Sequence, residues 1–350
     1  MTAANRIVTA CSQTEGPSCE KNWDRELQIW FVKRWASMSY RDLGFFAVIV
    51  QLFFALASAL ASESPEIIDL IPQELHLVTS LSGDTDTRVE RFSNQILARE
   101  PEVYQHLWHV DSAKVKAFVA KVPEYISGIR KLHALFEQQE PAILDRFCQA
   151  FPDFAPGKVK IYLMLSLFQF DAKIPSEHPD SLLIGLDGLA RFHGTDAPLA
   201  VILSHEFFHL YHFQVNPLPK NPDDLPLYRL LWQEGLAVYA SQQLNSGASL
   251  ADVLLDPRLA TNGPTSVRAE AKRLLLCLDS REDITAAHFL AKSENGEVPG
   301  RIGYLIGYDI AARLAQKRSL SALARLRDPG LRFALHREVY RLAYGTATSP

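Results

Sequence analysis

Cysteine is scarce in this chain of 350 residues, which has four in all. Cys11 and Cys19 precede an apolar segment near the amino terminus, so that only Cys148 and Cys277 lie beyond it. Two cysteines are too few for the disulfide framework of a small secreted scaffold, and none of the four has the spacing of a zinc site. The sequence does not place the Cα atoms of Cys148 and Cys277, so a disulfide and two separate thiols both remain open.

An excess of basic residues is also absent. Lysine and arginine number 36 against 40 acidic residues, the formal net charge is −4, and the positive charges form no stripe. Nucleic-acid binding therefore has no support. The chain shows no repeat or low-complexity segment, and residues 62–350 suffice for one large domain or two modest ones. The Arg-rich final segment is most simply a solvated helix face.

Long hydrophobic runs are limited to one, which extends over 19 uncharged residues from Leu43 to Ala61. Arg41 precedes this run and Ala59-Leu60-Ala61 closes it, a pattern typical of a secretory signal with an A-x-A cleavage site. Translation from Met38 would give a leader of ordinary length. The alternative is an uncleaved anchor, because about 19 apolar residues can span a bilayer. Both predict export of the remaining chain, to the periplasm or the exterior, and we favour cleavage.

The segment His205-Glu206-Phe207-Phe208-His209 is the strongest functional signal. It lies in a predicted helix from about Pro198 to Phe213, where residues four apart share a face, so both imidazoles can reach one metal ion. Glu206 between them suits a general base. The alternatives are two core histidines bonded to backbone carbonyls and a buried salt-bridge partner at Glu206.

A third ligand is predicted on the following helix. Four prolines among residues 216–226 indicate a loop, after which Leu227 to Gln243 regains helical periodicity. Glu234 in this second helix can complete a site of two histidines and one carboxylate, with a fourth position left for water. The small residues Gly235, Ala237 and Ala240 should let the two helices approach closely. The alternative role for Glu234 is a carboxylate favoured by the helix dipole.

Together with a later glycine-tyrosine motif, Gly303-Tyr304-Leu305-Ile306-Gly307-Tyr308, the HEFFH and WQEGLAVYA segments resemble the gluzincin class of zinc metallopeptidases. More specifically, they are similar to a bacterial family of predicted zinc-dependent proteases built on a domain of unknown function, in which an EGxAxY segment follows the HExxH helix. The likeness covers residues 158–317. Val238 departs from some gluzincins, which have an aspartate four residues after the ligand glutamate to orient a ligand histidine.

Upstream of the motif, residues 158–164 and 181–187 are predicted strands. The resemblance implies a zincin-like fold in which a small mixed sheet lies beside the HExxH helix and its edge strand lines a cleft, where an extended peptide can pair. The predicted class is α+β and mostly helical. We divide the chain into a leader (1–61), a helical region (62–157) and a metallopeptidase domain (158–350). Further helices are expected at 86–99, 111–121, 265–278, about 303–317 and 320–344.

The hypothesis for chemistry is peptide hydrolysis by a zinc-bound water that Glu206 deprotonates. A tyrosine usually stabilises the oxyanion in this class, and Tyr304 and Tyr308 share one face of their predicted helix. Ordinary amphipathic packing is an equal alternative for both, and His336 and Tyr239 are weaker candidates.

The sequence thus predicts an exported zinc metallopeptidase acting on peptides or proteins. The alternative is a noncatalytic exported protein that keeps the fold to bind peptides. A membrane contact is expected only through the amino-terminal segment. Endopeptidase or exopeptidase action, side-chain preference and oligomeric state do not follow from the sequence.

Overall fold

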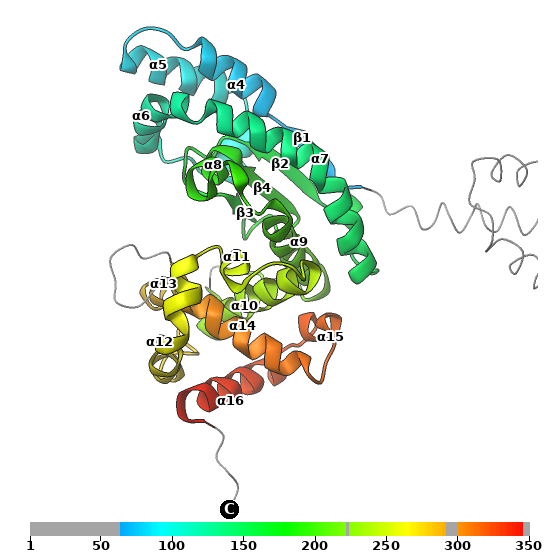
Figure 1. Cartoon of the computed structure of the whole chain (residues 1–350). Helices are drawn as coiled ribbons and strands as arrows, with labels where there is room; N and C mark the ends of the chain where they lie inside the picture. Colours follow the sequence, from blue (N-terminus) through cyan, green and yellow to red (C-terminus); the bar gives the residue numbers. More distant parts are fainter. Residues whose placement is uncertain (1–63, 222–223, 292–299, 346–350) are drawn as a thin grey trace, which may run out of the picture. The chain divides into compact units, whose positions relative to one another are not determined.

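A computed structural model describes residues 64–221, 224–291 and 300–345 (Figure 1). The predicted signal or anchor at 43–61 lies outside these ranges. Within them, no helix has the length and apolar character needed to cross a membrane. The ranges belong to one compact unit.

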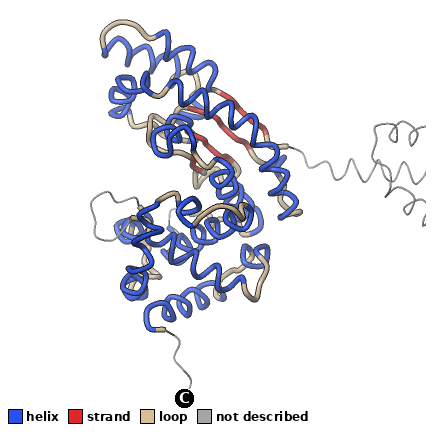
Figure 2. The backbone as a smooth tube through the Cα atoms, viewed as in Figure 1, coloured by secondary structure: helices blue, strands red, loops and turns tan. Residues whose placement is uncertain are grey.

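A four-stranded mixed sheet occupies the amino-terminal half of the described chain (Figure 2). Its order is β1-β2-β4-β3, in which β1, β2 and β4 run parallel and β3 runs antiparallel to β4. The predicted strands are confirmed as β2 and β4, whose apolar residues are buried on both faces as parallel strands require. The bounds are β1 Glu66–Asp69, β2 Lys160–Met164, β3 Ala172–Lys173 and β4 Ser181–Gly185.

Strand β1 is a correction to the predicted helical region, residues 62–157, which was expected to contain no strand. The parallel register Ile67 to Ile161 joins β1 to β2 across almost a hundred residues, so the predicted helical region shares the sheet of the predicted catalytic domain. A strand of four residues leaves too short a pattern to distinguish from a helix start.

Helices follow β1 up to residue 150. Asp84 and Asp111 cap two of them by accepting from the backbone N–H of Thr87 (2.8 Å) and Ala113 (2.9 Å). The long final helix α7 lies along the sheet in Figure 1. The bounds are α4 Ile71–Ser80, α5 Thr85–Phe92, π-helical turns Ser93–Leu97 and Glu102–Leu107, α6 Ser112–Lys121 and α7 Ile126–Ala150.

A clamped turn connects β2 to the edge strand β3. Leu167 and Phe168 adopt left-handed φ values of 53° and 58°, which side chains rarely adopt. The buried Asp187 carboxylate holds this turn by accepting from the backbone N–H groups of Ser166 and Phe168, each at 2.5 Å. Asp187 lies in the first turn of α8, Leu186–His193, so the predicted second strand ends two residues earlier than expected, at Gly185.

Gly188 lets α8 approach the same turn. A Cβ at this position would lie 1.8 Å from the Phe170 carbonyl oxygen, a distance that no side chain tolerates. Phe170 directly precedes Asp171 and β3, so this contact fixes where the edge strand runs.

The carboxyl-terminal half is helical, as predicted (Figure 1). Two expected boundaries are wrong. Helix α12 begins at Pro257 rather than 265, because Asp256 caps it. Its buried face extends from Leu259 to Leu274, and Pro264 lies inside the helix without ending it. The predicted helix 320–344 is two helices, since α15 ends at Ala324 and α16 starts after Pro329. The bounds are α9 Leu199–Val215, α10 Leu227–Leu244, α11 Leu250–Leu254, α12 Pro257–Leu275, α13 Asp283–Leu290, α14 Ile302–Ala315, α15 Leu320–Ala324 and α16 Gly330–Tyr344.

The predicted α+β, mostly helical class is therefore confirmed. One apolar core extends through both halves, with α9 between α7 and α10. No disulfide joins Cys148 to Cys277.

Candidate metal centre

Helix α9 holds the HEFFH segment rigidly within the core. Phe207 and Phe208 are fully buried and contact aromatic rings of α7 and the turn after it, with Phe207 packing edge-on against Phe147 at 5.8 Å between ring centroids. The opposite face presents His205 and His209 to a cavity. Because the phenylalanines fix the rotation of the helix, both imidazoles point the same way.

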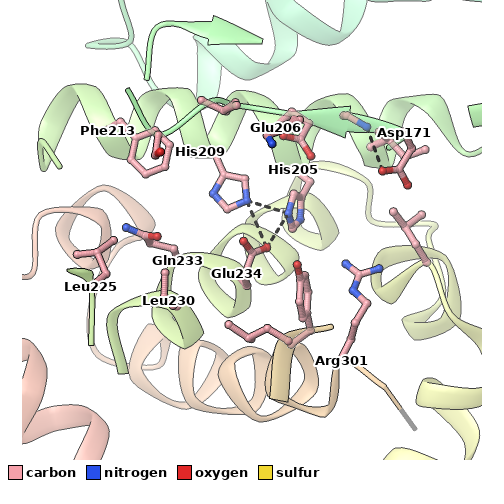
Figure 3. Close-up of a pocket in the computed structure, with 18 of the residues that line it drawn as sticks. Asp171, His205, Glu206, His209, Phe213, Leu225, Leu230, Gln233, Glu234 and Arg301 are labelled. Atoms are coloured by element: carbon pink, nitrogen blue, oxygen red, sulfur yellow. Dashed lines mark hydrogen bonds and ion pairs between the residues drawn. The ribbon is translucent and has the colours of Figure 1, made fainter. Parts of the chain in front are cut away.

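Three donor atoms converge at this face, as predicted (Figure 3). The Nε2 atoms of His205 and His209 are 3.0 Å apart, and they lie 3.4 and 3.5 Å from Oε2 of Glu234. A zinc ion at about 2.0–2.1 Å from three tetrahedral donors separates those donors by roughly 3.3–3.4 Å. The two histidine–glutamate separations are close to this spacing, and the separation between the two imidazole nitrogens is shorter, at 3.0 Å. The residue set therefore fits a tetrahedral ion after a small outward shift of the rings, with a fourth position facing the cavity.

The charges of the triad also favour a cation. Burial lowers the pKa of His205 to about 4, which keeps this imidazole neutral and its Nε2 lone pair available. For His209, burial lowers the pKa, but the Glu234 carboxylate outweighs burial and raises it. Burial similarly opposes ionisation of Glu234, yet the two imidazoles hold its pKa well below the usual range. The three side chains together attract positive charge to one point.

Glu206 faces the same cavity, next to the triad. Burial raises the pKa of its carboxyl to about 7; the His209 imidazole opposes this rise, and the Glu234 and Asp171 carboxylates add to it. A carboxylate whose pKa is near neutrality can both accept and return a proton.

Helix α10 presents Glu234 to the two histidines, but Gly235 does not serve the expected contact. We predicted that small residues would bring α10 close to α9. The Cα of Gly235 instead touches α14, where an added Cβ would lie 2.2 Å from the Cα and carbonyl carbon of Gly307. Gly235 therefore allows α14 to approach the ligand helix.

The structure separates the two candidate tyrosines. Tyr304 lines the cavity, and its phenol lies beside the Glu234 carboxylate; burial and this negative charge both raise its pKa. Tyr308 donates to Oε1 of Gln242 at 2.5 Å, packs against Tyr239 and does not line the cavity. His336 lies 3.3 Å from Asp279 and likewise takes no part in the lining.

The cavity measures about 540 Å³, within the range of small-ligand sites. One wall is the edge strand β3 with Asp171 before it, and the opposite wall is the amino end of α14. In the sheet order β3 is terminal, so its outer edge pairs with no other strand of the described sheet. An edge strand at the cleft was expected, although β3 itself, two residues long, was not identified.

Two further residues of the cleft were missed. Oδ2 of Asp171 lies 2.7 Å from Nε2 of the half-buried His193, and the carboxylate accepts when this nitrogen carries the ring proton. The guanidinium of Arg301 points into the cavity below His205 in Figure 3. Arg301 lies two residues before the glycine-tyrosine motif, so the sequence could have identified it as a candidate. No sequence pattern could have identified Asp171, because its position depends on the clamped turn.

With valine rather than aspartate at position 238, His209 has no carboxylate from this position to orient its ring. Val238 is fully buried, and among the residues the structure describes no group bonds Nδ1 of His209, although this nitrogen is buried. Packing by α9 aromatics, with Phe213 stacked at 6.0 Å between ring centroids, orients His209 instead.

A second group of possible ligands lies on the surface. Nε2 of His133 bonds Asp69 at 2.7 Å, while Nδ1 faces Glu137 at 3.8 Å. Because the two ring nitrogens point at different carboxylates, this group is better described as an ion-pair cluster.

Comparison of the chain with protein-family models, curated proteins and solved structures gives no significant match. The resemblance to gluzincins therefore depends on the three motifs and on the geometry of this cleft.

Proposed function

We propose that this protein is a zinc-dependent peptidase with a zincin-like cleft. The observation that carries the proposal is the convergence of His205, His209 and Glu234 on one point, with Glu206 facing the same cavity. A purely structural histidine pair would explain neither the third donor nor the second carboxylate, that of Glu206, which faces the cavity.

The ligands would be His205, His209 and Glu234, which offer the nitrogen and oxygen donors that zinc accepts in catalytic sites. Bound there, zinc would supply a Lewis acid that polarises a carbonyl and acidifies a water. The buried phenylalanines behind the histidines keep the donors in place.

Glu206 would move the proton. Its carboxylate faces the cavity and carries a pKa of about 7, raised chiefly by burial, so near neutral pH it can take a proton from an attacking water. The same carboxyl group can then deliver that proton to the nitrogen of the leaving amine.

Tyr304 would stabilise the oxyanion. Burial raises the pKa of its phenol, so the hydroxyl remains protonated and able to donate. Tyr308 is occupied with Gln242 away from the cavity and is not part of this proposal.

Strand β3 would position the substrate. A peptide can pair with its outer edge through backbone hydrogen bonds, which tolerate many side chains and hold the scissile carbonyl beside the triad. A peptide or protein is therefore the expected substrate class.

Replacement of Glu206 by glutamine tests the proposal. The amide keeps the shape but cannot accept the proton, so Glu206→Gln should lose hydrolysis of an unstructured protein or a mixed peptide library while retaining bound zinc. Mass spectrometry of the products measures hydrolysis and elemental analysis measures zinc. The matched control is Glu140→Gln, which changes a buried carboxylate of α7 outside the cavity and should leave turnover intact.

Two results would contradict this proposal. Normal hydrolysis by Glu206→Gln would remove the proton-transfer role. A wild-type protein that holds zinc at one ion per chain yet cuts nothing in the library would favour the alternative, a noncatalytic peptide-binding protein.

A further inference from the structure

Arg301 places a cation in the cleft wall. Its guanidinium carbon lies 3.8 Å from the centroid of the Tyr304 ring, and its side chain lines the same cavity as Glu206 and Glu234. Stacking on an aromatic ring covers the flat face of a guanidinium and leaves its N–H edge available to a ligand. Arg301 also shares a hydrogen bond with the phenol of Tyr304, so this contact orients the guanidinium and uses only part of its five N–H donors.

The backbone also holds Arg301 in place. It adopts a left-handed conformation, φ 62° and ψ 23°, directly before α14, and its N–H donates to the carbonyl of Ala291 at 2.9 Å. A residue with a side chain adopts this conformation at some cost in free energy, and such residues often occur at functional sites. A glycine or asparagine would adopt this backbone conformation more easily. The presence of arginine at this position therefore points to a function of its side chain.

Within the described ranges no carboxylate forms an ion pair with Arg301, whereas Arg229, for example, contacts Asp328 at 2.7 Å. Three carboxylates interact electrostatically with Arg301: Glu234 also contacts the two histidines, Asp171 also contacts His193, and Glu206 faces the cavity. Burial lowers the pKa of Arg301, but Tyr304 and the carboxylates of Glu234 and Asp171 outweigh burial and raise it. The side chain is therefore a firmly charged donor directed at open space.

Carboxylates are the natural ligands of such a group, because two oxygens match two parallel N–H donors of a guanidinium. On a peptide, the carboxylate is either the terminal one or the side chain of aspartate or glutamate.

We propose that Arg301 is the anchor of a carboxylate-binding subsite in this cleft, and that preferred peptides carry a carboxylate close to the scissile bond. This inference deepens the proposed function. The position of the carboxylate relative to a scissile bond depends on that function, because it presupposes peptide hydrolysis. A terminal carboxylate would make the enzyme a carboxypeptidase, and an acidic side chain would give it acidic specificity. The subsite itself requires only that peptides bind in the cleft.

The test measures binding separately from turnover. Full-length Glu206→Gln protein, loaded with zinc, is titrated calorimetrically with two matched peptide pairs. One pair differs only in a free or an amidated carboxyl terminus, and the other pair, amidated throughout, differs in one glutamate or glutamine. The carboxylate member of at least one pair should bind about 10- to 100-fold more tightly, the range of a charge-assisted contact.

Adding Arg301→Met should abolish this preference by weakening the carboxylate peptide alone, and Arg301→Lys should retain part of it. The amide peptides report whether each variant still folds and binds. The matched control is Arg191→Met, which removes another arginine near aromatic rings, Phe168 at 5.5 Å and Phe192 at 5.7 Å, outside the cavity. It should leave the preference unchanged.

Each outcome decides the matter. The pair that shows the preference identifies the terminal or the side-chain carboxylate. Equal binding within both pairs in the parent protein, or equal weakening of acid and amide peptides by Arg301→Met, would overturn the subsite. If the preference holds but wild-type protein hydrolyses neither pair, the subsite stands and the enzymatic proposal falls.

Discussion

Gly235 offers the most direct test of how the cleft is assembled. It lies beside the proposed ligand Glu234 on α10 and faces Gly307 on α14, one turn after Tyr304. In Gly235→Ala the new Cβ would lie 2.2 Å from two backbone atoms of Gly307, whereas ordinary contact begins at 3.4 Å. Helix backbones cannot rotate out of the way, so α10 and α14 must separate by roughly 1 Å, the shortfall in this contact.

The magnitude follows from two opposing terms. Overpacking costs about 1–3 kcal/mol, and alanine recovers up to about 1 kcal/mol through its higher helix propensity. We expect a net loss of about 1–2 kcal/mol in the free energy of unfolding, or a melting midpoint lower by several degrees. Because α9 and α10 keep their contact, zinc should stay bound. Tyr304 would move with α14, and a misplacement of about 1 Å can lower the rate about 100-fold.

Three measurements on one preparation separate these effects: the denaturant midpoint, the zinc content and the rate of peptide hydrolysis. Gly247→Ala is the control, because a Cβ there meets open space and its φ is not left-handed. If Gly235→Ala matched the wild type in midpoint and rate, the close helix contact would not organise the site. Loss of zinc together with activity would instead show that α14 supports the triad.

Two further predictions concern the turn before β3. Burial raises the pKa of Asp187 from 3.8 to about 6 in the folded protein, so folded protein binds more protons between these values and its stability falls as pH rises from about 4 to 6. The variant Asp187→Asn lacks this titration. In urea unfolding between about pH 4 and 6, the free energy of unfolding of the wild type should fall by up to about 3 kcal/mol relative to that of the variant. A difference that does not change with pH would refute the assignment. Gly188→Ala would push away the Phe170 carbonyl, so peptide binding should weaken several-fold with zinc content unchanged, and unaltered peptide affinity would show that β3 does not contact the substrate.

The convergence of the two histidines and Glu234 was predictable because its geometry is mostly local. His205 and His209 are four apart on one helix, which places them on one face whatever the rest of the chain does. Glu234 required only that the helix after the proline-rich segment pack against α9, and α10 does so. The mostly helical class followed similarly from periodicity within single segments.

The parts that the sequence did not yield depend on contacts between distant segments. Strand β1 has four residues and exists through pairing with β2, so no periodicity of its own marks it. Strand β3 has two residues and is defined by β4 and by the clamped turn. The choice between Tyr304 and Tyr308 could not be made from a shared helical face, because it depends on where α14 crosses α10.

The triad and Glu206 lie between two walls of the cleft, and a close contact between a glycine and a neighbouring backbone fixes the position of each wall. At Gly188 the turn touches α8, which sets β3 and the substrate edge; at Gly235 α10 touches α14, which sets Tyr304 and Arg301. The two approaches involve different helices and share no residue, so their effects should be separable. A substitution at Gly188 should change peptide affinity, and a substitution at Gly235 should change the rate of hydrolysis. The zinc content should be unchanged in both variants. If either substitution removed the metal, the triad would depend on the cleft walls, and the local helical geometry that predicted it would be an incomplete account of the site.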